Sequence, residues 1–284
     1  MTNQHKSRLF RLSVVANVLM FVMLCGIGYY KRASFVRLYD KHFAKSQVNE
    51  QELKAFNTVK YDGVSNYYTV ERGGQLKVLF LGNSLTYCGV AAEEPDKTRR
   101  GLTSTAPEKD YVHLVVKRLA EDNNASISYS ALNIADFERT FSTIPFDYSQ
   151  LEKLDVRQPD ILIVQIGENV SGDDIKSSGD AFEKAYIELL NCFPNAKKII
   201  CIPFWPDWRK AEHITNVALA TKSHLVDLSH LGGSVVAPHF PDAFDGRNLA
   251  QSYRKYKNPG VGIHPGDYGF SQIADAVYAA VVAE

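Results

Sequence analysis

Short apolar runs alternate with segments of helical periodicity from Lys77 to the end of the chain. The first run stops abruptly at Gly82-Asn83-Ser84, which is typical of a buried parallel strand followed by a tight turn. The predicted strands cover residues 77–82, 126–132, 160–166, 199–202 and 225–228. Helical spacing predicts helices over 108–120, 182–193 and 270–281. This alternation predicts an α/β fold with a central parallel, doubly wound sheet that helices cover on both faces.

The N-terminal part has a different pattern, because residues 12–30 carry no charge and are bracketed by Lys and Arg on both sides. A helix of this length, at about 1.5 Å per residue, spans a hydrocarbon core of roughly 30 Å, so we predict one transmembrane anchor. A cleaved signal peptide is the alternative, but no small-x-small site follows the run. The basic residues on both sides do not settle orientation. An anchor so close to the N-terminus favours a cell-membrane protein whose remaining part is extracytoplasmic. The expected organisation is a basic segment 1–11, the anchor 12–30, a connector 31–75 and a globular domain 76–284.

Composition and charge narrow the function classes. The chain has 284 residues with 32 basic and 32 acidic side chains, so no global charge attracts nucleic acid. It contains no clustered basic stripe and no glycine-rich phosphate loop, which argues against nucleic-acid or nucleotide binding. The four cysteines form neither a zinc pattern nor a disulfide framework, and the histidines lack ligand-like spacing. We therefore expect no metal and no cofactor.

Polar, turn-forming side chains follow three of the predicted strands, namely Ser84, Asn133 and Asn169. His264 lies near the C-terminus, just before the last predicted helix. Because ligands bind at the carboxyl ends of parallel strands, these residues are candidates for one site. Each also has an ordinary structural explanation, since serine and asparagine are common helix caps and turn residues. Together and in this order they fit a hydrolase with a serine nucleophile, amide donors for an oxyanion and a late histidine base.

These residues resemble the conserved blocks of the SGNH (GDSL-like) hydrolases, over roughly residues 76–284. Gly82-Asn83-Ser84-Leu85-Thr86 is similar to the first block, which implies that Ser84 is the nucleophile. Gly167-Glu168-Asn169 is similar to the third block, which implies that the Asn169 side chain donates to the oxyanion. Gly262-Ile263-His264-Pro265 is similar to the last block, which implies that His264 is the general base. The resemblance also implies a three-layer, flavodoxin-like sandwich and ester hydrolysis or acyl transfer on lipids and sugars.

The second block departs from the family pattern. The family supplies a glycine there whose backbone N–H completes the oxyanion hole, and counting from Asn133 places Glu138 at that position. A backbone N–H survives any side chain except proline, so we expect Ser84, Glu138 and Asn169 to form the oxyanion hole. Asn83 and Asn133 are candidate supporting residues. The variant block, together with residues 108–113, resembles a bacterial branch of the family that is associated with surface carbohydrate.

The last block departs more sharply, because Val261 stands where the family has the aspartate that orients the histidine. Losing such a carboxylate can cost orders of magnitude in rate. Three alternatives stay open. A backbone carbonyl can hold the ring of a Ser–His dyad, another carboxylate can reach the site, or the protein can be inactive. The candidate carboxylates are Glu168, Asp242 and Asp245. Asp267 is a poor substitute, because it most simply caps the last helix.

The function expected from the sequence is a membrane-anchored serine esterase that acts on O-acetyl groups of carbohydrate. An O-acyltransferase on surface polysaccharide would use the same residues, and lysophospholipids are a second substrate class. The alternative from another class is a non-catalytic carbohydrate-binding or assembly protein that has lost the aspartate at Val261.

Overall fold

The computed structural model describes residues 64–68, 75–90, 93, 97–123, 126–235, 256 and 258–283. All of them belong to one compact unit, Tyr61–Glu284. The predicted anchor 12–30 lies outside the described residues, as do Asp242 and Asp245. Among the residues that are described, no helix is both long enough and apolar enough to cross a bilayer.

The centre of the unit is a six-stranded sheet in the order β1-β3-β2-β4-β5-β6. Its strands are β1 (Val64–Tyr68), β2 (Gln75–Gly82), β3 (Ser126–Asn133), β4 (Ile161–Gln165), β5 (Lys197–Ile202) and β6 (His224–Asp227). The strands from β2 to β6 are parallel, whereas β1 pairs with β3 in antiparallel register. The five parallel strands follow the flavodoxin-like order 2-1-3-4-5, whose switch point lies at β2. The predicted parallel α/β fold is therefore confirmed.

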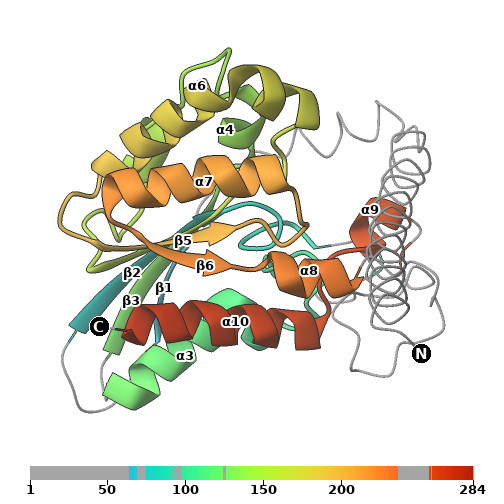
Figure 1. The fold of residues 1–284 in the computed structure, drawn as a ribbon. Coiled ribbons are helices and arrows are strands. Elements are labelled where there is room, and N and C mark those ends of the chain that lie inside the picture. The colour runs from blue at the N-terminus through green and yellow to red at the C-terminus, as the bar shows by residue number, and fades with distance from the viewer. Residues whose placement is uncertain are drawn as a thin grey trace, which may run out of the picture. The chain divides into compact units, whose positions relative to one another are not determined.

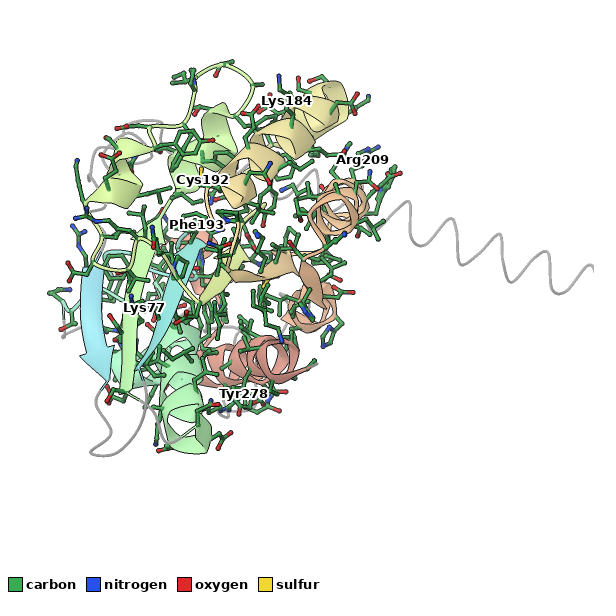
Figure 2. All side chains as sticks on the ribbon, turned by 90° about the vertical axis from the view of Figure 1, so that its left-hand side faces the viewer. Lys77, Lys184, Cys192, Phe193, Arg209 and Tyr278 are labelled. Carbon is green, nitrogen blue, oxygen red and sulfur yellow. The ribbon has the colours of Figure 1, made fainter. Side chains whose placement is uncertain are left out.

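Alternate residues of β2 face two separate cores, as expected of a strand covered on both sides. Val78 and Phe80 pack among the buried side chains of α3 (Tyr111–Asn123) and α10 (Asp267–Val282). Leu79 and Leu81 pack among those of α4 (Ala135–Thr140), α6 (Gly172–Asn191) and α7 (Trp208–Thr221). Figure 1 shows these two groups of helices on opposite sides of the sheet, and Figure 2 shows the same three layers from another side. The shorter helices are η1 (Pro107–Lys109), α5 (Ser149–Glu152), α8 (Ser229–Val235) and α9 (Pro259–Gly262).

The structure adds elements that the hydrophobic pattern does not reveal. Strand β1 lies in the segment 31–75 that we expected to be a connector, so the sheet extends upstream of residue 76. The first helix begins at Tyr111, not near Glu108, because Pro107–Lys109 forms a separate 3-10 turn. The short α4 directly follows β3 and brings polar side chains to the carboxyl edge of the sheet, where the candidate site lies.

Candidate active site

Ser84 lies in the turn that follows β2, at the switch point of the sheet. The turn is closed by the carbonyl of Asn83, which accepts from the N–H groups of Thr86 and Tyr87 at 3.0 Å each. Gly82 is required before it, because a Cβ atom there would lie 1.8 Å from Thr86 Oγ1. The Ser84 N–H has no acceptor within the described part of the chain. The turn thus presents both the hydroxyl and the backbone N–H of Ser84.

His264 lies beside this serine, although the two residues are 180 positions apart in the sequence. Its Nε2 atom is 2.9 Å from Ser84 Oγ, and its Nδ1 atom is 2.8 Å from the carbonyl oxygen of Gly260. A carbonyl oxygen can only accept, so Nδ1 carries the proton and Nε2 is left to accept from the Ser84 hydroxyl. This is the tautomer that a general base requires. Burial lowers the pKa of His264 to about 4, against the opposing effect of the Gly260 and Val261 carbonyls.

Val261, at the position of the family's aspartate, makes apolar contacts. Val261 is 7% exposed and packs in a small cluster with Cys88, Leu102 and Tyr256. Its side chain therefore belongs to the core, and the Gly260 carbonyl bonds to Nδ1 instead. Of the three alternatives that the sequence left open, the structure contains the backbone carbonyl.

The carboxylates expected as substitutes lie elsewhere or outside the described residues. Glu168 accepts from Asn83 Nδ2, Gln165 Nε2 and the N–H of Phe204, at 2.7, 2.5 and 2.8 Å, and has no bond to His264. The interpretation of Asp267 as a cap of the last helix is wrong, because Gly266 holds the N-cap position of α10 and no side chain caps it. The Asp267 carboxylate instead accepts from the N–H and the hydroxyl of Thr105.

A segment after the serine turn joins the serine to the histidine. Leu102 donates its N–H to the Ser84 carbonyl at 2.9 Å, and Thr103 Oγ1 donates to the Pro265 carbonyl at 2.8 Å. Arg100, which is fully buried, holds the segment by donating to the carbonyls of Ser104 and Thr98 at 2.8 and 2.6 Å. We call residues 98–105 the bridging segment.

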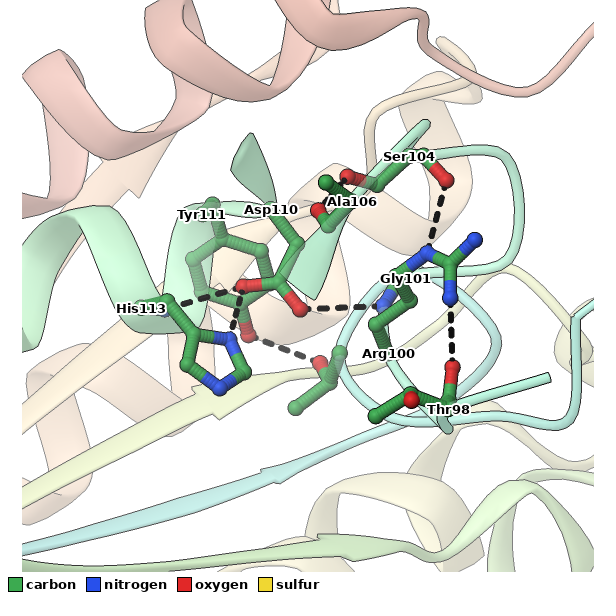
Figure 3. A network of polar contacts seen from close by, with 9 residues as sticks. Thr98, Arg100, Gly101, Ser104, Ala106, Asp110, Tyr111 and His113 are labelled. Atoms are coloured by element: carbon green, nitrogen blue, oxygen red, sulfur yellow. Dashed lines mark hydrogen bonds and ion pairs between the residues drawn. The ribbon is translucent and has the colours of Figure 1, made fainter. Parts of the chain in front are cut away.

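Figure 3 shows how this segment is fixed to α3. The buried Asp110 carboxylate accepts from the N–H of Gly101 at 3.1 Å and from both the N–H and Nδ1 of His113. The Asp110 hydrogen bond raises the pKa of His113, although burial of the ring opposes it. The hydroxyl of Tyr111, next in sequence, is 2.7 Å from Thr86 Oγ1 in the serine turn. The start of α3 thus supports both the bridging segment and the serine turn.

Asn169, the expected oxyanion donor, follows β4 and contacts two residues of α4. Its Nδ2 atom donates to Glu138 Oε2 at 2.7 Å, and its Oδ1 atom accepts from Arg139 Nη2 at 3.1 Å. The contribution of Glu138 differs from the expected one. Glu138 is the fourth residue of α4, where a backbone N–H normally bonds to the carbonyl of the N-cap residue, here Ile134. Its fully buried carboxylate contacts the site instead.

The buried Glu138 and the partly buried Glu168 form an acidic pair that Asn83 joins. Asn83 Nδ2 donates to both carboxylates, at 3.3 Å to Glu138 and 2.7 Å to Glu168. Burial and the neighbouring Glu168 charge raise the pKa of Glu138 to about 7, although the donors around it favour the ionised form. Burial also raises the pKa of Glu168, whose charge Lys210 partly offsets. Near neutral pH this pair of carboxyl groups therefore readily binds one proton.

The remaining candidates shape the surroundings. Asn133 supports the loop after the serine, because its Nδ2 donates to the Tyr87 carbonyl at 2.8 Å while its Oδ1 accepts from Ala135 N–H at 3.0 Å. The Trp205 ring lies 4.9 Å from the His264 ring in an edge-to-face arrangement. The Trp205 Nε1 atom is buried without a partner among the residues that the structure describes. Within those residues, no group of His, Cys, Asp and Glu could hold a metal ion.

The sequence allowed a backbone carbonyl behind His264 without identifying Gly260, gave no sign of Arg139, and did not show that Glu138 contacts the site through its carboxylate. The Gly260 carbonyl is a backbone group and leaves no trace in the residue type. Arg139 reads as an ordinary surface residue of a short helix. Glu138 was singled out, and the signal for its buried carboxylate was an acidic side chain at the position of the family's glycine.

No protein-family profile matches the chain, and no curated protein matches it. Similar solved structures include a two-domain esterase active on acetylated mannans, with 15% identity and a TM-score of 0.47. A family two carbohydrate esterase from Clostridium thermocellum is similar with 17% identity and a TM-score of 0.41. A protein named as a GDSL-like lipase from Parabacteroides merdae is similar with 16% identity and a TM-score of 0.48. The alignments cover 74%, 74% and 75% of this chain and 49%, 64% and 98% of those chains. The chain thus spans about half the length of the mannan esterase. The roles of the site residues rest on the geometry described above.

Proposed function

We propose that this protein is a serine esterase of the SGNH type, with Ser84 as nucleophile and His264 as general base. The observation that carries the proposal is the chain of contacts from Ser84 Oγ to His264 Nε2 and from His264 Nδ1 to the Gly260 carbonyl. It places a basic nitrogen against the hydroxyl and fixes the ring from behind.

In the proposed mechanism, Ser84 Oγ attacks the carbonyl carbon of an ester while its proton passes to His264 Nε2. The developing oxyanion is bound by the Ser84 N–H and by the Asn169 Nδ2 hydrogen that does not bond to Glu138. When the tetrahedral intermediate collapses, His264 returns the proton to the leaving alcohol and an acyl-serine remains. Water or a second alcohol then attacks the acyl-serine by the same steps, and Ser84 regains its proton.

The substrate class and the location are part of the same proposal. The sequence blocks favour O-acetyl groups of carbohydrate, and the uncharged segment 12–30 favours a membrane-anchored protein whose site faces away from the cytoplasm. Hydrolysis and transfer of the acyl group to a sugar hydroxyl require the same residues. They differ in the acceptor, so the products of the reaction distinguish them.

The deciding experiment uses the full-length protein with p-nitrophenyl acetate, acetylated mannan and a fluorophosphonate probe, alongside Ser84→Ala. We expect probe labelling of wild type, acetate release, and loss of both in the variant. Transfer to an added oligosaccharide would show the acyltransferase reaction. If the folded wild type is not labelled while it still binds carbohydrate, the esterase proposal is overturned in favour of a non-catalytic binding protein.

A further inference from the structure

Two neighbouring residues of α4 hold the Asn169 side chain at both of its ends. Glu138 Oε2 accepts from Nδ2 at 2.7 Å, and Arg139 Nη2 donates to Oδ1 at 3.1 Å. A carboxylate only accepts and a guanidinium only donates, so turning the amide over would break both bonds. One Nδ2 hydrogen remains, and it has no acceptor among the described residues. The amide therefore has a single orientation, in which this hydrogen is available.

Glu138 also holds the backbone that carries Asn169. Its Oε1 atom accepts from the N–H of Gly167 at 2.5 Å and from the N–H of Asn169 at 3.2 Å. Gly167 has φ of 120°, a conformation that residues with a side chain rarely adopt, so glycine permits the turn and the Glu138 bonds hold its backbone in place. Glu138 is completely buried, so water does not compete for these bonds. One carboxylate thus fixes both the path of this turn and the direction of its side-chain amide.

We propose that Glu138 and Arg139 are positioning residues, which act through Asn169 by holding its free Nδ2 hydrogen toward the oxyanion that forms at Ser84. The inference rests on the proposed function, because an oxyanion forms only if Ser84 attacks an ester. It gives the short α4 a task in the reaction although neither side chain is required to touch the substrate. We refer to this arrangement of Glu138, Asn169 and Arg139 as the amide clamp.

The first test is Glu138→Gln, which keeps the size of the side chain. The amide nitrogen of a glutamine is a donor and would face groups that are themselves donors. The amide clamp therefore loses some of its hydrogen bonds. We expect kcat for p-nitrophenyl acetate to fall about 100-fold, as for the loss of one oxyanion donor, while KM changes by less than about threefold. A merely structural role would lower the melting temperature without this separation of kcat from KM.

The second test asks whether the effect passes through Asn169. In the double variant Glu138→Gln/Asn169→Ala, the positioned amide is already absent. We expect kcat of the double variant to be within about threefold of that of Asn169→Ala alone. Losses that multiply would show that Glu138 acts by another route and would overturn the clamp.

Arg139→Met and Glu183→Gln complete the set. Arg139 is one-third exposed, so Arg139→Met should fold even where Glu138→Gln does not, and we expect about a tenfold loss of kcat. Glu183 on α6 is a matched control, since its carboxylate accepts from His213 and Asn216 on α7, and we expect kcat of Glu183→Gln to stay within twofold of wild type.

The outcomes separate the clamp from the proposed function. If Ser84→Ala abolishes turnover while Glu138→Gln and Arg139→Met both keep kcat within threefold of wild type, the clamp alone is overturned. If Ser84→Ala keeps the activity of wild type, the proposed function fails and the clamp fails with it.

Discussion

His264 Nδ1 lies 2.8 Å from the carbonyl oxygen of Gly260, which stands four residues earlier in the chain. A neutral carbonyl can fix the tautomer and the orientation of the ring, but it stabilises the charged imidazolium less than a carboxylate would. The geometry of a triad is thus kept with one charge fewer, and the behaviour of the site with pH should differ accordingly.

The acid limb of kcat/KM should lie well below the ordinary range of histidine. In the proposed mechanism His264 acts as base only when neutral, and burial lowers its pKa to about 4, so the ring stays neutral down to that pH. We expect complete loss of p-nitrophenyl acetate hydrolysis only near pH 4, measured on protein whose circular dichroism is unchanged. A complete loss centred near pH 6.5 would contradict this account of the ring.

Protonation of Glu138 should add a second, partial decrease to the pH profile of kcat/KM. Its pKa is raised to about 7, and the charged groups around it are Glu168 and Lys210, with the Tyr186 hydroxyl nearby. Protonation near pH 7 weakens the amide clamp without removing it, so kcat/KM should fall several-fold below that pH. The step should be absent in Glu138→Gln, and an identical step in the variant would assign it to another group.

The same carboxyl makes stability depend on pH. A raised pKa in the folded state means that stability is fully present below the ordinary value of 4.5 and is lost as pH rises through about 7. Relative to Glu138→Gln, wild type should lose up to about 3 kcal/mol of unfolding free energy between pH 4.5 and pH 8. Urea unfolding of both proteins at several pH values measures this difference, and His264 contributes equally to both.

Val261→Asp should not restore a triad. The Val261 side chain is buried against Cys88, Leu102 and Tyr256, so a carboxylate there would lose its hydration without gaining a partner. We expect the free energy of unfolding to fall by roughly 3 kcal/mol and kcat not to rise. Val261→Ala is the control, with a smaller loss of stability and nearly unchanged kcat. A gain in kcat for Val261→Asp would mean that its side chain can turn toward His264.

Thr103→Val tests the bridging segment. The substitution keeps the shape of the side chain but leaves the Pro265 carbonyl without its hydroxyl donor. We expect a loss of about 1–3 kcal/mol in unfolding free energy and a fall in kcat, because His264 precedes Pro265 directly. Thr143→Val, at an exposed threonine, should change neither quantity. Equal kcat in both variants would show that the bond is not needed to align the histidine.

The parallel sheet and its edge could be predicted because buried strands and the turns after them leave a strong hydrophobic pattern. The rule that parallel strands end at one edge predicts that the turns carrying Ser84 and Asn169 share a side of the sheet, and the resemblance added His264, which lies 2.9 Å from Ser84. Strand β1 was not predicted. It is an edge strand that pairs only with β3.

The contacts behind the site could not be predicted. The Gly260 carbonyl exists in every residue type, and a sequence does not show which backbone group faces an imidazole. The bonds of the Glu138 carboxylate could not be predicted for a related reason, because counting residues in a motif does not reveal which atoms of a residue make contacts. The burial of Arg100 and its bonds to carbonyls likewise depend on loop conformation, which hydrophobic periodicity does not encode.

The bridging segment has a consequence for how the protein can vary. It bonds to the Ser84 carbonyl on one side and to the Pro265 carbonyl on the other, so the proposed nucleophile and the proposed base are held by one segment of backbone. Substitutions on the outer faces of α6 and α7 can therefore loosen the sandwich without shifting the two reacting atoms against each other. Across a set of such variants, the melting temperature and kcat should vary independently of each other.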